Sequence, residues 1–237
     1  MGVIRQAAQV AFAIADSLRA RLPGPRILIY HQVGSGRSHE MNLPVEVFAR
    51  QLDWLLAHRE IVTLEQAVDR RTDPDADRLF VLTFDDGYAD VFQNAFPLLA
   101  ARRVPFTLYL TTGPIDRPED FADWPGLPLS WDQIREMHAS GLATIGAHTH
   151  THPDFRFVDE SEATEQIERS NRLIEQHLGM VPRHFTYPKG WWSEKADPVV
   201  RAAYATATVG MGPAVTADAD LHQLGRIPVM HSDPFWA

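Results

Sequence analysis

Three histidines alternate with threonine in one short stretch of the chain. Residues 146–153 read G-A-H-T-H-T-H-P, which places His148, His150 and His152 on alternate positions. If this stretch is extended, all three rings lie on one face; if it turns, His148 and His152 converge and His150 points elsewhere. Because the chain has no cysteine, a transition-metal site must use His, Asp or Glu. The stretch therefore predicts a metal site and leaves open which histidines bind.

A second stretch places two carboxylates side by side. T-F-D-D-G, residues 83–87, follows an apolar run and ends in a glycine that permits a sharp turn. Adjacent side chains of an extended chain face opposite ways, so a turn could send one carboxylate to a metal and leave the other as a base. Asp-Asp-Gly alone is typical of any strand-to-helix turn. Two histidines with one carboxylate, however, form a usual site for a hydrolytic or redox metal.

Short apolar segments predict the strands that must bring these motifs together. They lie at residues 26–31, 78–84, 104–110, 142–147, 184–187, 205–209 and 225–230. Helical patterns separate them, at 45–55, 91–101 and 159–178 and after two capping boxes, T-L-E-Q (63–66) and S-W-D-Q (130–133). The proline-rich residues 111–129 predict a long ordered loop. This alternation predicts a parallel sheet, either doubly wound or closed into a barrel.

Polar residues recur where the predicted strands end. In both architectures the active site lies at the carboxyl ends of the strands. The residues just past the strands are His31, Asp85-Asp86, His148 to His152, Tyr187-Pro188 and His231. Their common position predicts one site with the groups of a metal hydrolase.

Composition limits the classes of ligand. The chain has 237 residues, of which 45% are hydrophobic, and this suits a single domain over residues 1–237. A formal net charge of -9 argues against a nucleic-acid partner, because phosphate binding needs a basic stripe. A neutral or cationic ligand is more compatible with this charge.

Residues 1–22 predict an amphipathic helix. Its apolar residues recur at helical spacing, at Val3, Ala7, Val10, Ile14 and Leu18. Such a helix lies on the domain or on a membrane surface, which allows peripheral membrane contact. A signal peptide is the alternative, but Gln9 interrupts the apolar core that it requires.

Taken together, the motifs are similar to those of one known family. T-F-D-D-G (83–87), H-T-H-T-H-P (148–153) and F-T-Y-P-K-G (185–190) resemble the polysaccharide deacetylases of carbohydrate esterase family 4, the NodB-homology domain. The resemblance runs from about Arg26 to Val229 and includes I-Y-H-Q-V and S-W-D-Q-I-R-E-M-H-A-S-G. The I-Y-H and Y-P-x-G forms look most like the subgroup that deacetylates poly-N-acetylglucosamine in exopolysaccharides and biofilms. The resemblance implies a distorted (β/α)7 barrel.

The resemblance also implies a role for each motif residue. Asp85 would be the general base, and Asp86, His148 and His152 would hold one divalent metal ion, with zinc preferred. The reaction would be hydrolysis of the N-acetyl group from a glucosamine residue of a polysaccharide. His150 is then expected to point away from the metal.

The sequence departs from the main family pattern at the general acid. Most members supply a histidine on a late L-x-H strand, for which His231 in V-M-H is the candidate. The subgroup looks circularly permuted, so His31 at the end of the first strand fits the role better and is preferred. The usual arginine of the R-x-P-Y motif is replaced by Thr186, and Arg226 is predicted to orient Asp85 instead.

Substrate contacts are expected around the Y-P-K-G motif. The candidates are Tyr187, Pro188, Lys189, Trp191 and Arg226, with Trp192 and Trp124 as further rings that could stack on sugars. A backbone N–H near Pro188 to Lys189 would stabilise the oxyanion.

Other readings of the same chemistry stay open. They are a deacetylase or esterase acting on chitin oligomers, peptidoglycan or a lipid-linked sugar, and a non-catalytic glycan-binding relative. The complete Asp-Asp and His-x-x-x-His motifs argue against the last, since a binding module needs no base. The expected location is the bacterial cytoplasm or the periphery of the inner membrane, with a periplasmic or secreted location as the alternative.

Overall fold

The strands of this protein close into a parallel barrel. The computed structural model describes residues 23–212 and 214–232, so the predicted helix over residues 1–22 lies outside the described residues. The barrel strands are β1 (Arg26–Tyr30), β5 (Leu79–Phe84), β6 (Phe106–Leu110), β7 (Ala143–Ala147), β8 (His184–Thr186), β9 (Thr206–Met211) and β10 (Leu224–Pro228). Each pairs in parallel with its neighbour in this order, and β1 pairs with both β10 and β5, which closes the barrel. The predicted seven-stranded barrel is confirmed.

Short elements extend this barrel at its edge and rim. A two-residue strand, β4 (Glu60–Ile61), pairs in parallel with the first two residues of β5. The pair β2 (Gln32–Val33) and β3 (Asn42–Leu43) forms a small separate sheet after β1. This small sheet anchors the loop that follows His31.

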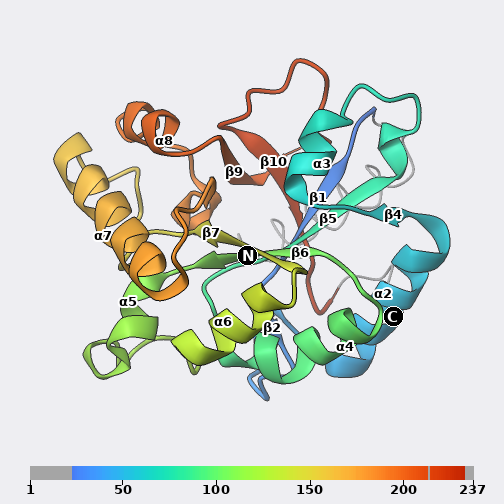
Figure 1. Ribbon diagram of the computed structural model, residues 1–237, viewed down its shortest axis with the longest axis horizontal. Helices are drawn as coiled ribbons and strands as arrows, with labels where there is room; N and C mark the ends of the chain where they lie inside the picture. Colours follow the sequence, from blue (N-terminus) through green and yellow to red (C-terminus); the bar gives the residue numbers. More distant parts are fainter. Residues whose placement is uncertain (1–22, 213, 233–237) are drawn as a thin grey trace, which may run out of the picture.

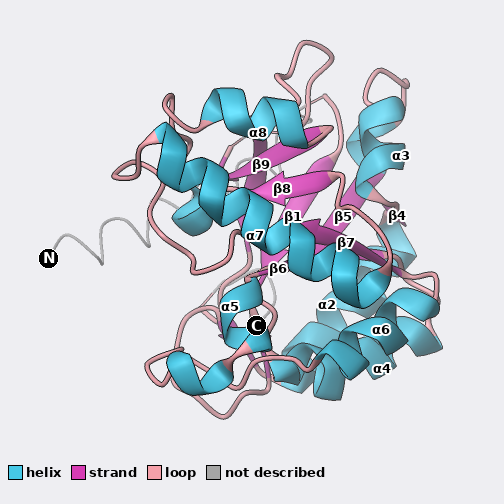
Figure 2. Ribbon diagram, turned by 60° about the vertical axis from the view of Figure 1, so that its left-hand side comes forward, coloured by secondary structure: helices cyan, strands magenta, loops and turns pink. Residues whose placement is uncertain are grey.

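Helices surround the strands, as Figures 1 and 2 show. They are α2 (Val45–His58), α3 (Leu64–Asp69), α4 (Phe96–Ala101), α5 (Thr112–Asp116), α6 (Trp131–Ala139), α7 (Glu160–Leu178) and α8 (Asp197–Ala203). Short helical turns are η1 (Ala76–Arg78), η2 (Val91–Ala95), η3 (Pro118–Asp120) and η4 (Pro188–Gly190). No described helix has the length and apolarity needed to cross a bilayer.

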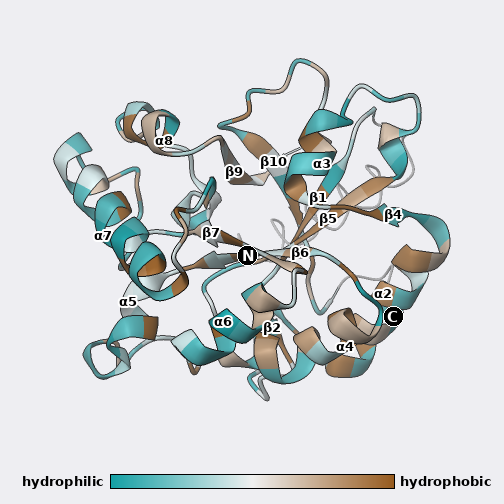
Figure 3. Ribbon diagram, in the orientation of Figure 1, coloured by the Kyte–Doolittle hydropathy of each residue, from teal (hydrophilic) through white to brown (hydrophobic). Residues whose placement is uncertain are grey.

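Alternation along each strand separates two sets of side chains. In β5, Phe80, Leu82 and Phe84 join the large cluster under the helices, whereas Leu79 and Val81 join a smaller cluster with Ile27 and Leu224. The hydropathy colouring in Figure 3 shows the corresponding brown faces of helices turned toward the strands. The smaller cluster includes Leu64 of α3 and fills one end of the barrel. Thr83 and Arg226 lie on the same side of their strands as Val81 and Leu224, nearer the other end of the barrel.

Local sequence signals set several helix boundaries. Both predicted capping boxes are present: the Thr63 and Ser130 hydroxyls accept from the backbone N–H groups of Gln66 and Gln133. The predicted helix over 91–101 consists of the π-helical η2 followed by α4, with Pro97 in the first turn of α4, where a missing N–H costs least. The predicted loop 111–129 contains the short helices α5 and η3.

Candidate active site

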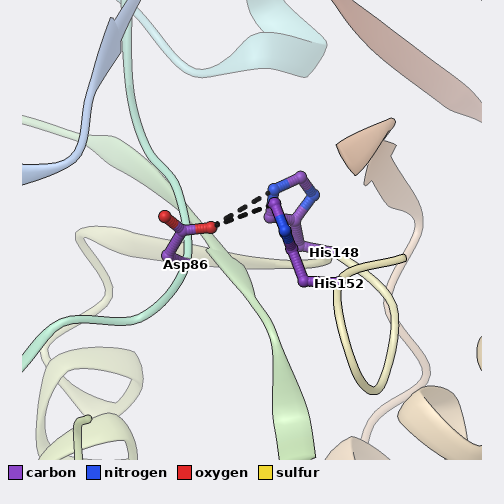
Figure 4. Close-up of side chains that lie close together, drawn as sticks. All are labelled: Asp86, His148 and His152. Carbon is purple, nitrogen blue, oxygen red and sulfur yellow. Dashed lines mark ion pairs between the residues drawn. The ribbon is translucent and has the colours of Figure 1, made fainter. Parts of the chain in front are cut away.

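The side chains of Asp85 and Asp86 point in different directions because the chain turns sharply after β5. Asp86 and Gly87 both have positive φ, 72° and 82°. The Asp85 N–H donates to the Tyr30 carbonyl (3.0 Å), which holds the start of this turn against β1. Asp85 therefore continues the inward face of β5, while Asp86 is directed to the histidines in Figure 4.

The histidine stretch also turns, so the first and third rings converge. Thr149 and His152 have positive φ, 69° and 60°, and the His152 N–H donates to the Thr149 hydroxyl (3.0 Å). The ring centroids of His148 and His152 lie 4.7 Å apart. His150 instead lies with its Nδ1 3.0 Å from the Thr112 hydroxyl, outside this group. The histidine stretch is therefore turned and not extended, which is one of the two conformations that the sequence allows.

Asp86, His148 and His152 fit a metal ion. The Nε2 atoms of both histidines lie 3.5 Å from Asp86 Oδ1 (Figure 4), and one ligand atom from each residue falls within 4.8 Å of the others. Ligand atoms of a tetrahedral zinc, each about 2.0–2.1 Å from the ion, are separated by about 3.3 Å. Asp86 Oδ1 is buried and has no hydrogen-bond partner, which is costly unless a cation binds there.

The protonation of both histidines suits a metal. Burial lowers the pKa of His148 to about 3 and that of His152 to about 4, so both rings are neutral near pH 7. His148 Nδ1 lies 2.7 Å from the Thr186 carbonyl oxygen, which can only accept. The proton of His148 is therefore on Nδ1, and Nε2 offers its lone pair to the ion, an arrangement common among metal-binding histidines.

Asp85 is held by a buried arginine. The Arg226 guanidinium donates to both carboxylate oxygens at 2.8 Å, and also to the hydroxyls of Thr83 (3.0 Å) and Thr186 (2.6 Å). Burial alone would raise the pKa of Asp85, but the charge and hydrogen bonds of Arg226 outweigh it and lower the pKa to about 2. Asp85 is thus ionised and fixed in orientation. Arg226 reaches Asp85 from β10 and orients it, as the sequence predicts.

The two candidate acids lie in different places. His31 follows β1 and lines the cavity that contains Asp85 and Asp86, and its Nδ1 is buried without a hydrogen-bond partner. His231 is exposed, its backbone N–H donates to the Glu40 carbonyl (2.7 Å), and its side chain lines a neighbouring hollow. Only His31 is close to the paired carboxylates.

Comparison with known proteins identifies the family. The family model described as Polysaccharide deacetylase matches residues 72–208, more than half of the chain. The chain belongs to the polysaccharide deacetylase family. Among its relatives is the poly-beta-1,6-N-acetyl-D-glucosamine N-deacetylase of Staphylococcus epidermidis, 26% identical over 208 residues, 83% of this chain and 71% of the relative.

Solved structures have the same barrel. That of IcaB from Ammonifex degensii superposes with a TM-score of 0.76 at 29% identity, over 91% of this chain and 94% of that one. The Streptococcus pyogenes deacetylase PplD, at 20% identity, gives a TM-score of 0.75 over 88% of this chain and 93% of that one, a likeness of fold.

The site of this polysaccharide deacetylase lies in a cavity of about 660 Å³ at the carboxyl ends of the strands. His31, Asp85, Asp86, His148, His152, Lys189 and Arg226 line it, together with apolar side chains such as Ile29, Met41, Met211 and Met230. Its polar groups come from separate strand ends, as the sequence predicts.

Three residues of the predicted substrate-binding set lie outside the cavity. Tyr187 is 0% exposed and packs against Phe185, with its hydroxyl 3.4 Å from Asp197, so its side chain faces the core. Pro188 is buried and does not line the cavity. Trp191 is 46% exposed and stacks under the Arg156 guanidinium (4.7 Å), outside the cavity. Side chains two residues apart on a strand lie on the same face, so Tyr187 points outward with Phe185 and not into the barrel.

Sequence reasoning missed several residues at this site. Tyr88 is buried and hydrogen bonds to Asp86, and Arg37 and Met211 line the cavity. Met211 ends β9 and Tyr88 directly follows the T-F-D-D-G motif, but neither residue type signals this chemistry. Arg37 in particular lies in a Gly-Ser-Gly-Arg loop with no sequence signal for binding.

Proposed function

We propose that this protein is a metal-dependent N-deacetylase that removes acetyl groups from N-acetylglucosamine residues of an exopolysaccharide. One observation carries the proposal: an Asp-His-His group with an orphaned carboxylate oxygen lies in the same cavity as an ionised, arginine-held second aspartate. A sugar-binding module would need neither. The named substrate of the Staphylococcus epidermidis relative supports the choice of glycan.

Asp86, His148 and His152 would hold the divalent ion, for which zinc is our first choice because the donor set is two imidazoles and a carboxylate. When bound, the ion supplies Lewis-acid polarisation of the amide carbonyl and lowers the pKa of a water molecule. The buried neutral rings and the Thr186 carbonyl orient the donor atoms before the ion arrives. This preorganisation limits the cost of binding.

Asp85 takes the proton from the attacking water. Its low pKa keeps it ionised at working pH, and the two Arg226 hydrogen bonds fix the direction of its free lone pairs. The bidentate contact makes Asp85 a weak base in the ground state. Asp85 therefore accepts the proton in the transition state, when the water is already losing it. Arg226 thereby orients the base.

His31 protonates the departing amine, and a backbone N–H binds the oxyanion. His31 is the histidine in the cavity whose Nδ1 lacks a protein partner. Pro188 has no N–H and that of Gly190 donates to the Tyr187 carbonyl (2.9 Å), so we assign the oxyanion contact to the Lys189 N–H.

Acetate release tests this function directly. We expect release from N-acetylglucosamine oligomers that stops with a chelator and returns when zinc is added. Asp85→Asn should keep its metal but lose release by about a hundredfold or more, as for loss of a general base. Acetylxylan and peptidoglycan serve as alternative substrates. Full activity of Asp85→Asn, or release that a chelator does not affect, would refute the proposal.

A further inference from the structure

The cavity has free cations and no free carboxylate among the described residues. Its acidic lining residues are Asp85, which is bonded to Arg226, and Asp86, which belongs to the candidate metal group. Arg37 and Lys189 also line it, are exposed, and form no ion pair with any residue that the structure describes. The unneutralised charge at this cavity is therefore positive, although the chain has a net charge of -9.

Lys189 occupies a backbone position that favours glycine. Its φ is 58°, and the following Gly190 has φ of 72°. A Cβ atom on Gly190 would lie 2.4 Å from the Gly210 Cα, so the turn is packed tightly on β9 and cannot easily relax. A left-handed non-glycine residue costs about 1–2 kcal/mol. A charged residue that lines the cavity from such a strained position is a candidate for a functional contact.

Arg37 is placed where three hollows meet. It lines the cavity and two neighbouring hollows, one of which also contains Trp124 and Gln93. Its loop is tied by Asn42, whose side-chain amide donates to the Arg37 carbonyl (2.7 Å) and accepts from the Ser35 N–H (3.0 Å). The guanidinium can therefore reach a group bound at the mouth of the cavity while the backbone stays in place.

We propose that Arg37 and Lys189 form an anion subsite at the cavity mouth, which binds a carboxylate or phosphate next to the N-acetylated sugar. The inference rests on the proposed function and names its substrate class as an acidic glycan. Guanidinium and ammonium groups make charge-assisted hydrogen bonds to such anions. Charges beyond about 8 Å are largely screened at physiological salt, so local cations outweigh the net negative charge. The net charge of -9 favours a neutral or cationic ligand, whereas the local charge at this cavity favours an anion.

The test compares kcat/KM for acetate release from three probes. They are neutral tetra-N-acetylchitotetraose, a hyaluronan tetrasaccharide with carboxylates, and N-acetylglucosamine 1-phosphate. We expect at least one anionic probe to exceed the neutral one by about tenfold at physiological salt, and this ratio to fall near one in Arg37→Gln and in Lys189→Gln. The exposed Arg50→Gln and Lys195→Gln make the same charge changes elsewhere and should leave the ratio unaltered. The probe that is preferred distinguishes carboxylate from phosphate.

Calorimetric binding of the same probes to metal-loaded Asp85→Asn separates the two proposals. Tighter binding of an anionic probe that is lost with Arg37→Gln supports the subsite even if no probe releases acetate, an outcome that would refute only the deacetylase function. Equal binding and equal kcat/KM for all three probes, or equal losses for neutral and anionic probes in both variants, would overturn the subsite and leave the deacetylase standing. Lys189→Gly should unfold at a higher temperature while it loses the preference, because glycine suits its φ.

Discussion

At the scale of single residues, two neighbouring aspartates have opposite environments. Asp85 has a full set of partners from Arg226, whereas Asp86 Oδ1 has none among the described residues. The positive φ of Asp86 creates this difference, because it turns one carboxylate away from the strand direction of the other. One aspartate is therefore suited to proton transfer and the other to a cation.

Removal of Arg226 should expose the cost of a buried, unpaired Asp85. We expect Arg226→Met to lower the free energy of unfolding by about 3–5 kcal/mol, measured by urea denaturation. The double variant with Asp85→Asn should recover part of this loss. Arg201→Met removes surface ion pairs to Asp197 and Asp220 and should cost about 1 kcal/mol or less. Equal losses in Arg226→Met and Arg201→Met would contradict the pairing.

Asp90 predicts a pH dependence of stability outside the metal group. Burial raises its pKa to about 6, although its Oδ1 accepts from the Val33 N–H (2.6 Å). The unfolded chain loses this proton near its ordinary pKa of 3.8, so ionisation favours unfolding and stability declines as pH rises from about 4 to about 6. Asp90→Asn should stabilise the protein at pH 7.5 but not at pH 4, in urea denaturation. The exposed Asp123→Asn should show no such difference.

The residues of the candidate metal group could be predicted from the sequence, whereas the residues around them were harder to predict. Asp86, His148 and His152 follow strands, and strand ends converge in a parallel barrel. Tyr187 also follows a strand, but its side chain lies on the face that packs into the core. Arg37 and Tyr88 reach the site from loops whose paths depend on tertiary contacts. A prediction from strand ends cannot include them.

At the scale of elements, the alternation of side chains along each strand determines which residues point into the barrel and form the site. Leu108 and Phe185 face the helices, whereas Tyr109 and Thr186 face the barrel interior. All seven predicted strands are found, because apolar runs bounded by turn residues mark buried parallel strands clearly. Helix α8 (Asp197–Ala203) was not predicted, since seven residues give too little periodic pattern.

Close packing inside the barrel makes β7 sensitive to added volume. A Cβ atom on Gly146 would lie 2.4 Å from Tyr109 Cδ1 and 3.0 Å from the His184 carbonyl oxygen. We expect Gly146→Ala to lower the free energy of unfolding by about 1–3 kcal/mol. Acetate release should fall as well, because β7 positions His148. Thr144→Ala, on the same strand and face, should have the smaller effect on both denaturation and turnover.

At the scale of the whole molecule, the candidate metal group brings together separate parts of the chain. Asp86 follows β5, whereas His148 and His152 follow β7, with β6 between them. An ion bound to all three favours the folded barrel, because the unfolded chain does not hold these ligands together. Binding should therefore appear in global stability as well as in activity.

Thermal unfolding measures this linkage. At an ion concentration about a hundred times Kd, binding adds about 2.7 kcal/mol of stability. For a domain of this size that corresponds to a rise in Tm of about 5–10 °C. We expect zinc to raise the Tm of chelator-treated protein by this amount, and to leave the Tm of Asp86→Asn nearly unchanged. The same shift in both proteins would place the ion elsewhere.

Matched replacement of two buried histidines tests the central claim most directly. His148 and His150 are two residues apart and similarly buried, but only His148 faces Asp86. Metal content per chain and acetate release are measured together for His148→Ala and His150→Ala. We predict that His148→Ala loses both, whereas His150→Ala keeps its metal and most of its release. Full metal in His148→Ala, or its loss only in His150→Ala, would contradict the account.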